Sequence, residues 1–509
     1  MIKEALHPLF FALALDPSSP IPLYRQLADA IRQTILSGKL AAGTKLPSTR
    51  LCARNLGISR FTVLTAFEQL LAEGYIYGQE GSGTYVTDVL PDSLLELPDK
   101  TAPLAPAEEQ KRKLSRRGAV LANSMVMPQF LESGGAVSAF RPGLPALDQF
   151  PYTIWRRLLT KRWNRFPAEL LGYSDPAGFL PLREQIATYV RAARGVQCVA
   201  EQVIVVAGSQ QAIELAARLL LDPGDAIWME DPGYPGARGA LLGAAAQVIA
   251  VPVDEQGLDI AQGIHLGKHA SLAYVTPSHQ FPLGVTTSLP RRLALLSWAN
   301  QVGAWILEDD YESEYRYTGR PLPSLQGLDA TGRVIYIGTL SKVLFPGLRL
   351  GYLIVPSDLV EAFVAARKLM DRQPPIIDQL VLTDFMSQGH FSRHLRRMRT
   401  LYEERQTLLI EAVRRELAGL LAVAPSEAGM HLVGNLAEGL NETQISRAAA
   451  QQGIIVPPLS AYSQRALNSR ALLLGYTAFN AQQINLAVQS LARTFKKTMQ
   501  DDMSASTAP

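Results

Sequence analysis

Apolar residues near the amino terminus recur with the period of a helix. Four of them are spaced four positions apart: Leu23, Leu27, Ile31 and Ile35. This spacing predicts an amphipathic helix over residues 22–37 that Gly38 ends. A second, shorter helix is predicted over 48–55, because Ser48 is a favourable N-cap and Gly57 supplies the left-handed residue that closes a helix.

A third helix is predicted after a tight turn, with Ser59 as its cap. Its inward face is formed by Val63, Ala66, Phe67 and Leu70. Its outer side then carries Arg60, Phe61, Thr62 and Leu64. Two short helices joined by such a turn form a helix-turn-helix, which presents the first residues of its second helix to base edges. A helical module used only for dimer packing is the alternative.

Two β-like segments follow Gly74. Residues 75–77 and 84–87 have strand composition, and a glycine-containing stretch over 79–83 joins them. A hairpin directly after a helix-turn-helix is a wing. The amino-terminal part is therefore predicted to be a winged helix-turn-helix.

The longer carboxy-terminal part alternates short apolar runs with helical patterns. The apolar runs cover 203–207, 226–229, 271–275, 304–307 and 334–337. Strands that alternate with helices indicate an α/β body with a mostly parallel central sheet, here with a smaller C-terminal α+β subdomain.

The stretch between these parts has the character of a linker. Four prolines fall within sixteen residues after residue 90, and a basic cluster follows them over 111–117. No clear amphipathic period crosses this stretch, so we expect two folded bodies on a tether. The predicted organisation is a DNA-binding domain over 17–88, a linker over 89–135, an effector and dimerisation domain over 136–498, and a flexible tail over 499–509.

Composition supports a multidomain globular protein. The chain has 509 residues, of which 47% are hydrophobic and 19% charged. It has two cysteines, and its apolar runs fall short of the roughly 18 residues that span a bilayer. We therefore expect a cytoplasmic protein with no disulfide framework and no metal site.

Charge is balanced overall but not locally. The net charge is +3, too small to mark the whole chain as a nucleic-acid binder. Between residues 39 and 67, however, five basic residues occur with no acidic one: Lys39, Lys45, Arg50, Arg54 and Arg60. This pattern fits either a surface that binds phosphates or an ordinary solvated face.

Lys342 is a candidate for covalent chemistry. It follows the predicted strand 334–337, and it lies near two hydroxyls and a guanidinium that could bind phosphate, those of Thr339, Ser341 and Arg349. A lysine that forms a Schiff base needs such a confined site. Taken alone, a lysine beside a strand is usually a surface residue.

Two further segments make that candidate more specific. Asp309 lies at the carboxyl end of the strand 304–307, where α/β folds bind ligands, and it could pair with the protonated pyridine nitrogen of pyridoxal phosphate. Ser209 and Gln210 lie between the strand 203–207 and a helix expected to start near Gln211, where helix N–H groups favour a phosphate. An acidic loop and an ordinary turn are the plain alternatives, so only the combination indicates a cofactor site.

The amino-terminal motifs resemble the winged helix-turn-helix of GntR regulators. They are Pro47-Ser48-Thr49-Arg50, Leu56-Gly57-Ile58-Ser59-Arg60, Glu73-Gly74-Tyr75 and Gly81-Ser82-Gly83-Thr84-Tyr85-Val86. The resemblance implies a double-stranded operator, contacts from Arg50 and Arg60 to bases or phosphates, and entry of the wing tip at Gly83 into the minor groove. The full predicted DNA-binding set is Lys45, Ser48, Thr49, Arg50, Ser59, Arg60, Thr62 and Gly83. Phe61 and Leu64 depart from the polar residues common at these places, so the operator sequence does not carry over.

Residues from about 140 to 495 resemble the fold type I aminotransferases. The motifs are Gly172-Tyr173-Ser174-Asp175-Pro176-Ala177-Gly178, Asp231-Pro232-Gly233-Tyr234, Asp309-Asp310-Tyr311 and the segment around Lys342. The resemblance implies a homodimer in which Tyr173 reaches the cofactor phosphate of the other subunit. It also implies that Lys342 forms the Schiff base with pyridoxal 5'-phosphate, that Tyr234 stacks on the ring, and that Tyr311 bonds the phenolic oxygen. By the same resemblance, Asp309 pairs with the ring nitrogen, and the phosphate is held by Ser209, Gln210, Thr339, Ser341 and Arg349.

Two departures from that family affect ligand recognition. Phe281 stands where the family usually has an asparagine donor, and the segment 471–476, where many aminotransferases have a carboxylate-binding arginine, contains none. Arg141 and Arg470 are the basic residues considered as substitutes, and for both a structural salt bridge is the simpler role.

The two halves together resemble the MocR/GabR subfamily of GntR regulators, to which His279-Gln280-Phe281-Pro282 and residues 394–399 are also similar. This implies a transcriptional regulator whose aminotransferase-like domain senses pyridoxal phosphate, a small amino compound or both, through external aldimine formation. An active aminotransferase with an accessory DNA-binding domain is the alternative, and a sensor of pyridoxal phosphate alone is a third possibility. The residues do not indicate the effector, the target genes or the sign of regulation.

Overall fold

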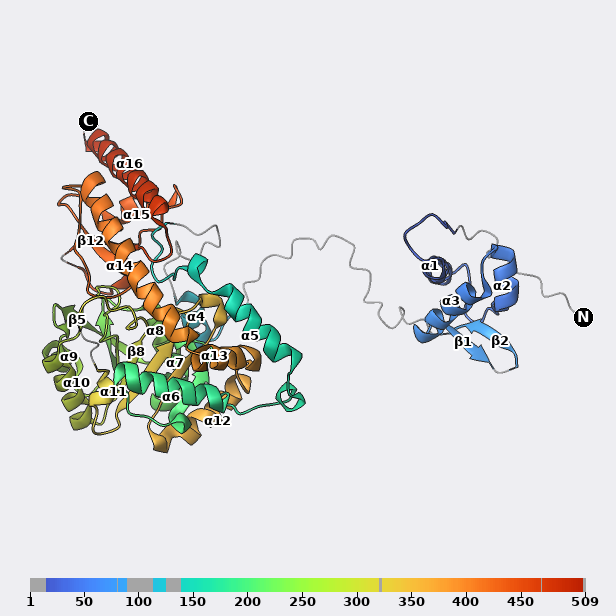
Figure 1. Ribbon diagram of the computed structural model, residues 1–509, viewed down its shortest axis with the longest axis horizontal. Helices are drawn as coiled ribbons and strands as arrows, with labels where there is room; N and C mark the ends of the chain where they lie inside the picture. Colours follow the sequence, from blue (N-terminus) through green and yellow to red (C-terminus); the bar gives the residue numbers. More distant parts are fainter. Residues whose placement is uncertain are drawn as a thin grey trace, which may run out of the picture. The chain divides into compact units, whose positions relative to one another are not determined.

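The computed structural model describes residues 15–79, 81–88, 113–124, 139–319, 323–467 and 469–506 (Figure 1). The chain divides into two compact units, Met1–Lys113 and Leu114–Pro509, and each has a hydrophobic core of its own. Most of the predicted linker 89–135 lies outside the described residues.

The first unit is a three-helix body with a two-stranded wing. Its elements are α1 (Leu23–Leu36), α2 (Thr49–Leu56), α3 (Arg60–Ala72), β1 (Ile76–Gln79) and β2 (Gly83–Val86). Leu27 of α1 and Phe67 of α3 share one core with Val86 of the wing, so the hairpin is fixed to the helices. β1 and β2 pair antiparallel with Ile76 opposite Val86. The predicted winged helix-turn-helix is confirmed to within a residue or two at each end.

Short polar side chains set where these helices begin. The Ser59 hydroxyl accepts a hydrogen bond from the Thr62 backbone N–H at 3.0 Å, and Ser48 accepts one from Leu51 at 3.4 Å. These bonds satisfy N–H groups that have no partner inside the helix. Gly57, with a φ of 66°, ends α2 in the left-handed region and turns the chain into α3.

The second unit is built on an eight-stranded sheet in the order β3-β10-β9-β8-β7-β4-β5-β6. The strands are β3 (Val203–Val206), β4 (Ala226–Asp231), β5 (Gln247–Asp254), β6 (Gly257–Leu258), β7 (Leu272–Val275), β8 (Trp305–Asp310), β9 (Val334–Thr339) and β10 (Gly351–Ile354). The pairs from β5 through β4, β7, β8 and β9 are parallel, and the outer pairs are antiparallel. The predicted α/β body with a mostly parallel sheet is confirmed.

Helices cover this sheet, and a smaller subdomain follows it. The helices are α5 (Tyr152–Asn164), α6 (Leu180–Arg194), α7 (Ser209–Leu220), α8 (Pro235–Gly243), α9 (Ile260–Gly267), α10 (Leu289–Val302), α11 (Leu325–Leu328), α12 (Val360–Asp371) and α13 (Ile376–Ser387). Alternate residues of β3 enter different cores, with Val205 in one and Ile204 in the other. Both faces of the sheet are therefore buried, as parallel sheets require.

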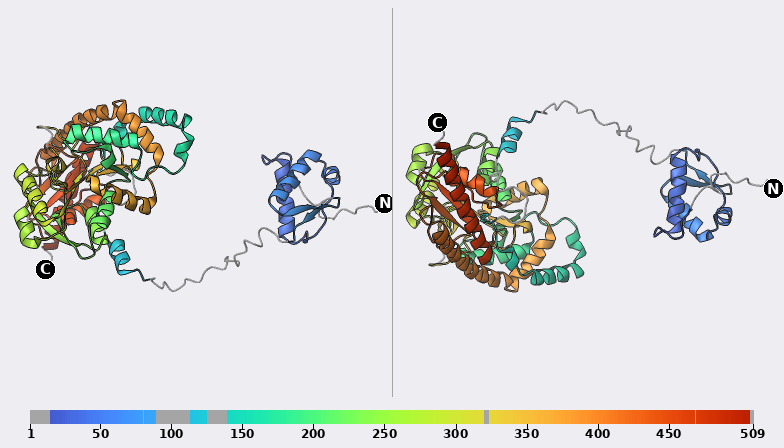
Figure 2. Two further views of the ribbon diagram at one scale, coloured as in Figure 1. Left: turned by 90° about the horizontal axis from the view of Figure 1, so that it is seen from below. Right: turned by 90° about the horizontal axis from the view of Figure 1, so that it is seen from above.

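The C-terminal subdomain combines a three-stranded antiparallel sheet with three helices. Its elements are α14 (His390–Glu416), β11 (Leu421–Val423), β12 (His431–Leu436), α15 (Glu442–Ala450), β13 (Ala471–Gly475) and α16 (Ala481–Ser506). Helix α16 packs against α14, and the right-hand view shows the two helices side by side (Figure 2). Helix α16 continues through Ser506, past the start of the predicted tail at residue 499.

One helix lies in the stretch for which the sequence pattern predicted only a linker. Helix α4 (Arg116–Asn123), capped by Ser115, packs on α8. A Cβ on Gly243 would come within 2.5 Å of the Leu121 side chain, so the glycine allows the two helices to approach closely. Residues 114–124 of the predicted linker thus belong to the second unit.

Candidate functional site

The carboxyl ends of the parallel strands gather the residues of the candidate site. Asp309 is the second-last residue of β8, which extends three residues beyond the run predicted from sequence. Its Oδ2 accepts a hydrogen bond of 2.7 Å from the Tyr274 hydroxyl on the neighbouring strand β7. Its Oδ1 is buried and has no hydrogen-bond partner among the described residues. Burial raises the pKa of Asp309 to about 7, although the Tyr274 hydrogen bond opposes the rise.

Lys342 follows β9 and reaches the same edge of the sheet. Its Nζ donates a hydrogen bond of 3.0 Å to the carbonyl oxygen of Gly143. Burial lowers the pKa of Lys342, while Glu312 and Asp309 act in the opposite direction. A lowered pKa favours the neutral amine, which is the nucleophilic form of lysine. A Cβ on Gly143, whose φ is 71°, would be strained and would lie 2.7 Å from Nζ, so a side chain there would displace the amine.

Positive groups converge at the amino terminus of α7. Helix α7 begins at Ser209, two residues earlier than predicted, so Ser209 and Gln210 lie in its first turn with backbone N–H groups that no helical carbonyl reaches. Gly208, with a φ of 112°, precedes them, and a Cβ there would lie 3.5 Å from the guanidinium of Arg349. The hydroxyls of Thr339 and Ser341 are on the adjoining turn, where the Ser341 N–H bonds Thr339 Oγ1 at 3.3 Å. A helix amino terminus next to a guanidinium is suited to a phosphate.

Tyr234 lies between these two parts of the site. It precedes α8, and its hydroxyl is 3.4 Å from Oε1 of Gln210. Burial and the neighbouring Asp309 raise the pKa of Tyr234 to about 12, so its hydroxyl stays protonated at neutral pH. Phe281, which replaces the family's asparagine, packs edge-on against aromatic rings of Tyr234, Tyr311 and Tyr462. No polar donor therefore comes from the side chain at position 281.

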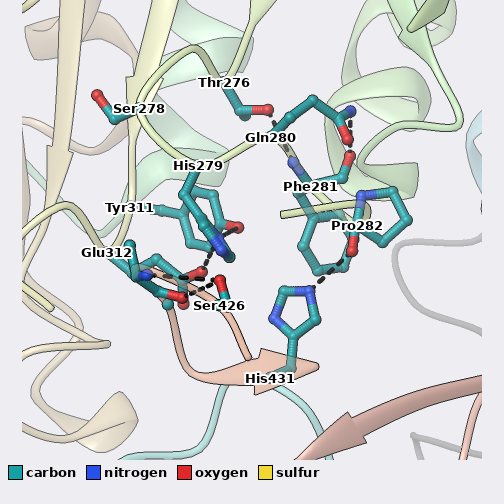
Figure 3. Close-up of polar contacts among 12 residues, drawn as sticks. Thr276, Ser278, His279, Gln280, Phe281, Pro282, Tyr311, Glu312, Ser426 and His431 are labelled. Atoms are coloured by element: carbon teal, nitrogen blue, oxygen red, sulfur yellow. Dashed lines mark hydrogen bonds and ion pairs between the residues drawn. The ribbon is translucent and has the colours of Figure 1, made fainter. Parts of the chain in front are cut away.

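A buried histidine and carboxylate lie beside Tyr311 (Figure 3). His279 Nδ1 is 2.5 Å from Glu312 Oε1 and 3.3 Å from the Tyr311 hydroxyl. Although burial opposes it, the neighbouring His279 lowers the pKa of Glu312. Burial and the contact with Glu312 raise the pKa of Tyr311. His431 of β12 approaches from the C-terminal subdomain and bonds the Pro282 carbonyl oxygen at 2.9 Å.

The residues at this edge fit pyridoxal phosphate. Asp309 Oδ1 is buried, has no hydrogen-bond partner among the described residues, and could accept a bond from a ring N–H. Lys342 has an amine that could react with the aldehyde, and Arg349 together with the start of α7 could bind the phosphate. The Asp309 and Lys342 side chains are electrostatically coupled, as are those of Tyr234 and Arg349. Nine predicted cofactor residues thus come from separate segments to one strand edge: Ser209, Gln210, Tyr234, Asp309, Tyr311, Thr339, Ser341, Lys342 and Arg349.

Tyr173 is not part of this group within the described chain. Its ring is 80% exposed and lies 4.7 Å from the guanidinium carbon of Arg372. Its predicted contact with a second subunit remains a prediction.

Sequence reasoning overlooked several polar residues of the site. Tyr274 and Glu312 were not singled out, and His279 was quoted only within a motif. Each acts through a partner on another strand or loop, which local sequence does not show. Arg470, considered for carboxylate binding, instead donates to the Leu440 carbonyl oxygen at 3.1 Å.

The predicted DNA-binding residues lie on α2, α3 and the wing. Ser48, Thr49 and Arg50 form the start of α2, and Arg60 is exposed at the start of α3. Ser59 and Thr62 bond each other through their hydroxyls at 2.8 Å, so both help to cap α3. Lys45 approaches the wing, since a Cβ on Gly83 would lie 3.0 Å from its Cε.

Two family models match the chain. Residues 23–86 match the family described as bacterial regulatory proteins of the gntR family. Residues 165–490 match the family described as aminotransferase class I and II. The part of the chain that the structure describes contains no candidate membrane-spanning helix.

The chain is also similar to regulators along nearly their whole length. It is 40% identical over 486 residues to a probable rhizopine catabolism regulatory protein MocR of Rhizobium meliloti, covering 95% of this chain and 96% of the relative. It is 33% identical over 450 residues to the pyridoxine biosynthesis transcriptional regulator PdxR of Corynebacterium glutamicum, covering 88% and 91%.

The second unit is also similar to a solved aminotransferase structure. The α-aminoadipate aminotransferase LysN of Thermus thermophilus, in complex with N-(5'-phosphopyridoxyl)-L-leucine, superposes with a TM-score of 0.68 at 28% identity. The match covers 76% of this chain and all of that one.

Proposed function

The chain belongs to the MocR/GabR subfamily of GntR regulators, and on that premise we propose that pyridoxal phosphate bound at Lys342 governs its binding to DNA. The winged helix-turn-helix binds an operator, and the aminotransferase-like domain responds to pyridoxal phosphate and to a small amino compound. We also infer that two copies of the chain act as a homodimer, in which the exposed Tyr173 of one copy would be free to reach the site of the other.

The observation that carries the proposal is that Asp309 and Lys342 both lie, buried, at one strand edge and influence each other electrostatically. A buried carboxylate oxygen without a partner costs free energy unless a ligand satisfies it. Burial also lowers the pKa of Lys342, which favours the neutral amine, and the neutral amine is the form that reacts with carbonyls. These two features are difficult to explain as contributions to stability alone.

Each residue of the site has a definite task. When bound, pyridoxal phosphate supplies an aldehyde carbon and an electron-withdrawing ring. Lys342 would hold the cofactor through its amine, which is the nucleophilic group toward that aldehyde. Asp309 keeps the ring nitrogen protonated, and Tyr234 and Phe281 form apolar walls that exclude water. Arg349 and the first turn of α7 fix the phosphate.

The Tyr311 hydroxyl is oriented by its neighbours. His279 Nδ1 lies 3.3 Å from that hydroxyl and 2.5 Å from Glu312. Because Phe281 stands where the family usually has an asparagine, the Tyr311 hydroxyl is the group that would donate a hydrogen bond to the phenolic oxygen of the cofactor. His279 and Glu312 are positioning residues for it.

Helix α4 links the site to the tether. Tyr234 is the N-cap of α8, and α4 at the end of the linker packs on α8. A cavity of about 250 Å³ lies at this junction, lined by Asn123 and Ser124 of the linker together with Glu230, Arg238 and Tyr462. A difference in the position of Tyr234 between the cofactor-free and the loaded protein would move α8 and, with it, helix α4.

The test is a DNA-binding titration of the full chain in three states. Fluorescence anisotropy would measure the affinity of the protein for a DNA duplex taken from the promoter region of the gene that encodes it. The measurement would be made without cofactor, with pyridoxal phosphate, and with pyridoxal phosphate plus a panel of amines. We expect affinity to change with the state of the site in wild type and to stay constant in Lys342→Ala. Equal affinity of wild type in all three states would contradict the proposal.

An active aminotransferase is the second candidate, and it is supported by the assembled set of Lys342, Asp309 and Tyr311. Repeated turnover with an amino donor and a keto-acid acceptor would favour that candidate.

A further inference from the structure

The outer face of α3 carries two exposed apolar side chains at the place where a helix-turn-helix reads bases. Phe61, the second residue of α3, is 76% exposed, and Leu64, one turn later, is 40% exposed. The large residues of α3 that face inward, such as Val63 and Phe67, are nearly or fully buried. The phenylalanine at position 61 therefore adds little to the core of this unit.

An exposed phenylalanine at this position suggests a ligand that would cover it. Burial of such an apolar side chain is favourable, so leaving it in water forgoes that stabilisation. No aromatic or cationic side chain among the described residues stacks on Phe61. Its neighbours in sequence on α3 are Arg60 and Thr62, both at the first turn of the helix.

Charge around the pair favours a polyanion as the occupant. Arg60 is exposed next to Phe61, and Arg50 and Arg54 belong to the preceding helix α2. The first acidic residue on α3 is Glu68, two turns beyond Phe61. An apolar spot inside a basic face is unusual for a surface that binds another protein's apolar groove, but it is suited to the floor of the DNA major groove.

The major groove offers one apolar group to such side chains. Its base edges consist of hydrogen-bond donors and acceptors, except for the 5-methyl group of thymine. Residues three apart on a helix lie on one face, with roughly 5–6 Å between their Cβ atoms. Phe61 and Leu64 could thus contact methyl groups on neighbouring base pairs while Arg60 and Arg50 bind phosphates or a polar base edge.

We propose that Phe61 and Leu64 read the 5-methyl groups of thymines in the operator half-site. This inference rests on the proposed DNA binding and adds to it the kind of base that α3 selects. Covering one methyl group contributes about 0.8 kcal/mol, which corresponds to about a fourfold change in affinity at 1.4 kcal/mol per factor of ten.

The experiment removes the methyl group and the side chain separately. Full-length wild type would first be used to enrich a duplex from a random-sequence pool. Each thymine of that duplex would then be replaced singly by deoxyuridine, which lacks only the methyl group. Affinity for each duplex would be measured for wild type, Phe61→Ala and Leu64→Ala. Leu36→Ala is the control, because Leu36 is a similarly exposed apolar residue on α1.

We expect wild type and Leu36→Ala to lose about fourfold in affinity at one or two thymines in each half-site. At one of those positions Phe61→Ala should bind the thymine and deoxyuridine duplexes equally, and Phe61→Leu should retain part of the difference. Circular dichroism would confirm that the variants keep their helices.

The outcomes separate the two levels of the proposal. The methyl contact is overturned, and DNA binding left intact, if wild type loses no affinity when thymine is replaced by deoxyuridine. It is also overturned if that loss of affinity is unchanged in both Phe61→Ala and Leu64→Ala. An enriched half-site without thymine overturns it as well. Failure of wild type to enrich any duplex overturns the proposed function and this inference together.

Discussion

Replacing Asp309 by asparagine should stabilise the cofactor-free protein at alkaline pH and weaken its response to pyridoxal phosphate. The carboxylate lies inside β8 with one oxygen bonded to Tyr274 and the other without a partner among the described residues. Asparagine has the same shape and can still accept the Tyr274 hydrogen bond, but it carries no charge. Burial of charge is the property that this substitution changes.

The magnitude follows from the pKa of the group. Burial raises the pKa of Asp309 from 3.8 to about 7. Because the folded state holds this proton more tightly than the unfolded state, its stabilising contribution is complete below about pH 4 and falls as pH rises toward about 7. At pH 8 the ionised carboxylate costs up to roughly 4 kcal/mol, at about 1.36 kcal/mol for each pH unit between the two pKa values.

Thermal unfolding of cofactor-free wild type and Asp309→Asn should be compared between pH 5 and pH 8. Glu308 and Glu314 also have pKa values raised to about 7, but they are present in both proteins and cancel in the difference. The charge of Asp309 also contributes to the raised pKa of Glu230, so the difference reports the Asp309 carboxylate together with its repulsion of Glu230. We expect the variant to melt several degrees higher at pH 8 and the gap to narrow toward pH 5. Addition of pyridoxal phosphate should raise the melting temperature of wild type far more than that of the variant. A variant that is less stable at pH 8, or that gains as much from the cofactor, would refute the reasoning.

Three further predictions concern the DNA-binding unit, the cofactor site and helix α4. Arg50→Ala should weaken operator binding by about 1 to 3 kcal/mol and reduce the salt dependence of affinity, measured by anisotropy between about 50 and 200 mM salt; unchanged affinity would remove Arg50 from the interface. Lys342→Ala should lose covalent retention of pyridoxal phosphate in dialysis but keep its fold and some DNA binding, and full covalent retention would place the attachment elsewhere. Leu121→Asp should detach α4 from α8 and make DNA affinity independent of pyridoxal phosphate while cofactor uptake stays normal, because Leu121 lies against Gly243 of α8. Val120→Asp is the control, because Val120 is on the same helix and about as exposed as Leu121 but does not lie against Gly243; equal effects of the two variants would argue against the α4 contact.

Sequence patterns anticipated much of this fold for simple physical reasons. The winged helix-turn-helix was predictable because Leu27, Ile31, Val63 and Phe67 recur with the helical period and all become core residues. The strands β3, β4, β7, β8 and β9 were predictable because a sheet that is buried on both faces requires continuous apolar runs. Lys342 and Asp309 could be picked out because each closely follows or ends such a run.

Other features depend on contacts between distant segments. The pairing of His279 with Glu312 joins the loop after β7 to the residues after β8, and no local pattern indicates that these two side chains meet. Tyr274 has the pattern of a strand core residue, yet its hydroxyl bonds Asp309. Helix α4 was missed because it has only eight residues, none of which is buried. Its sequence therefore shows only a weak apolar period, although Leu121 contacts Gly243.

The central claim is tested most directly by borohydride trapping of the cofactor on the full-length protein. Wild type incubated with pyridoxal phosphate would be examined by visible absorption before and after reduction, and the labelled peptide would be identified by mass spectrometry, with Lys342→Ala alongside. The account predicts a visible band that reduction removes, a single label on Lys342, and neither feature in the variant. A protein that acquires no band, or a label on another lysine, would contradict it.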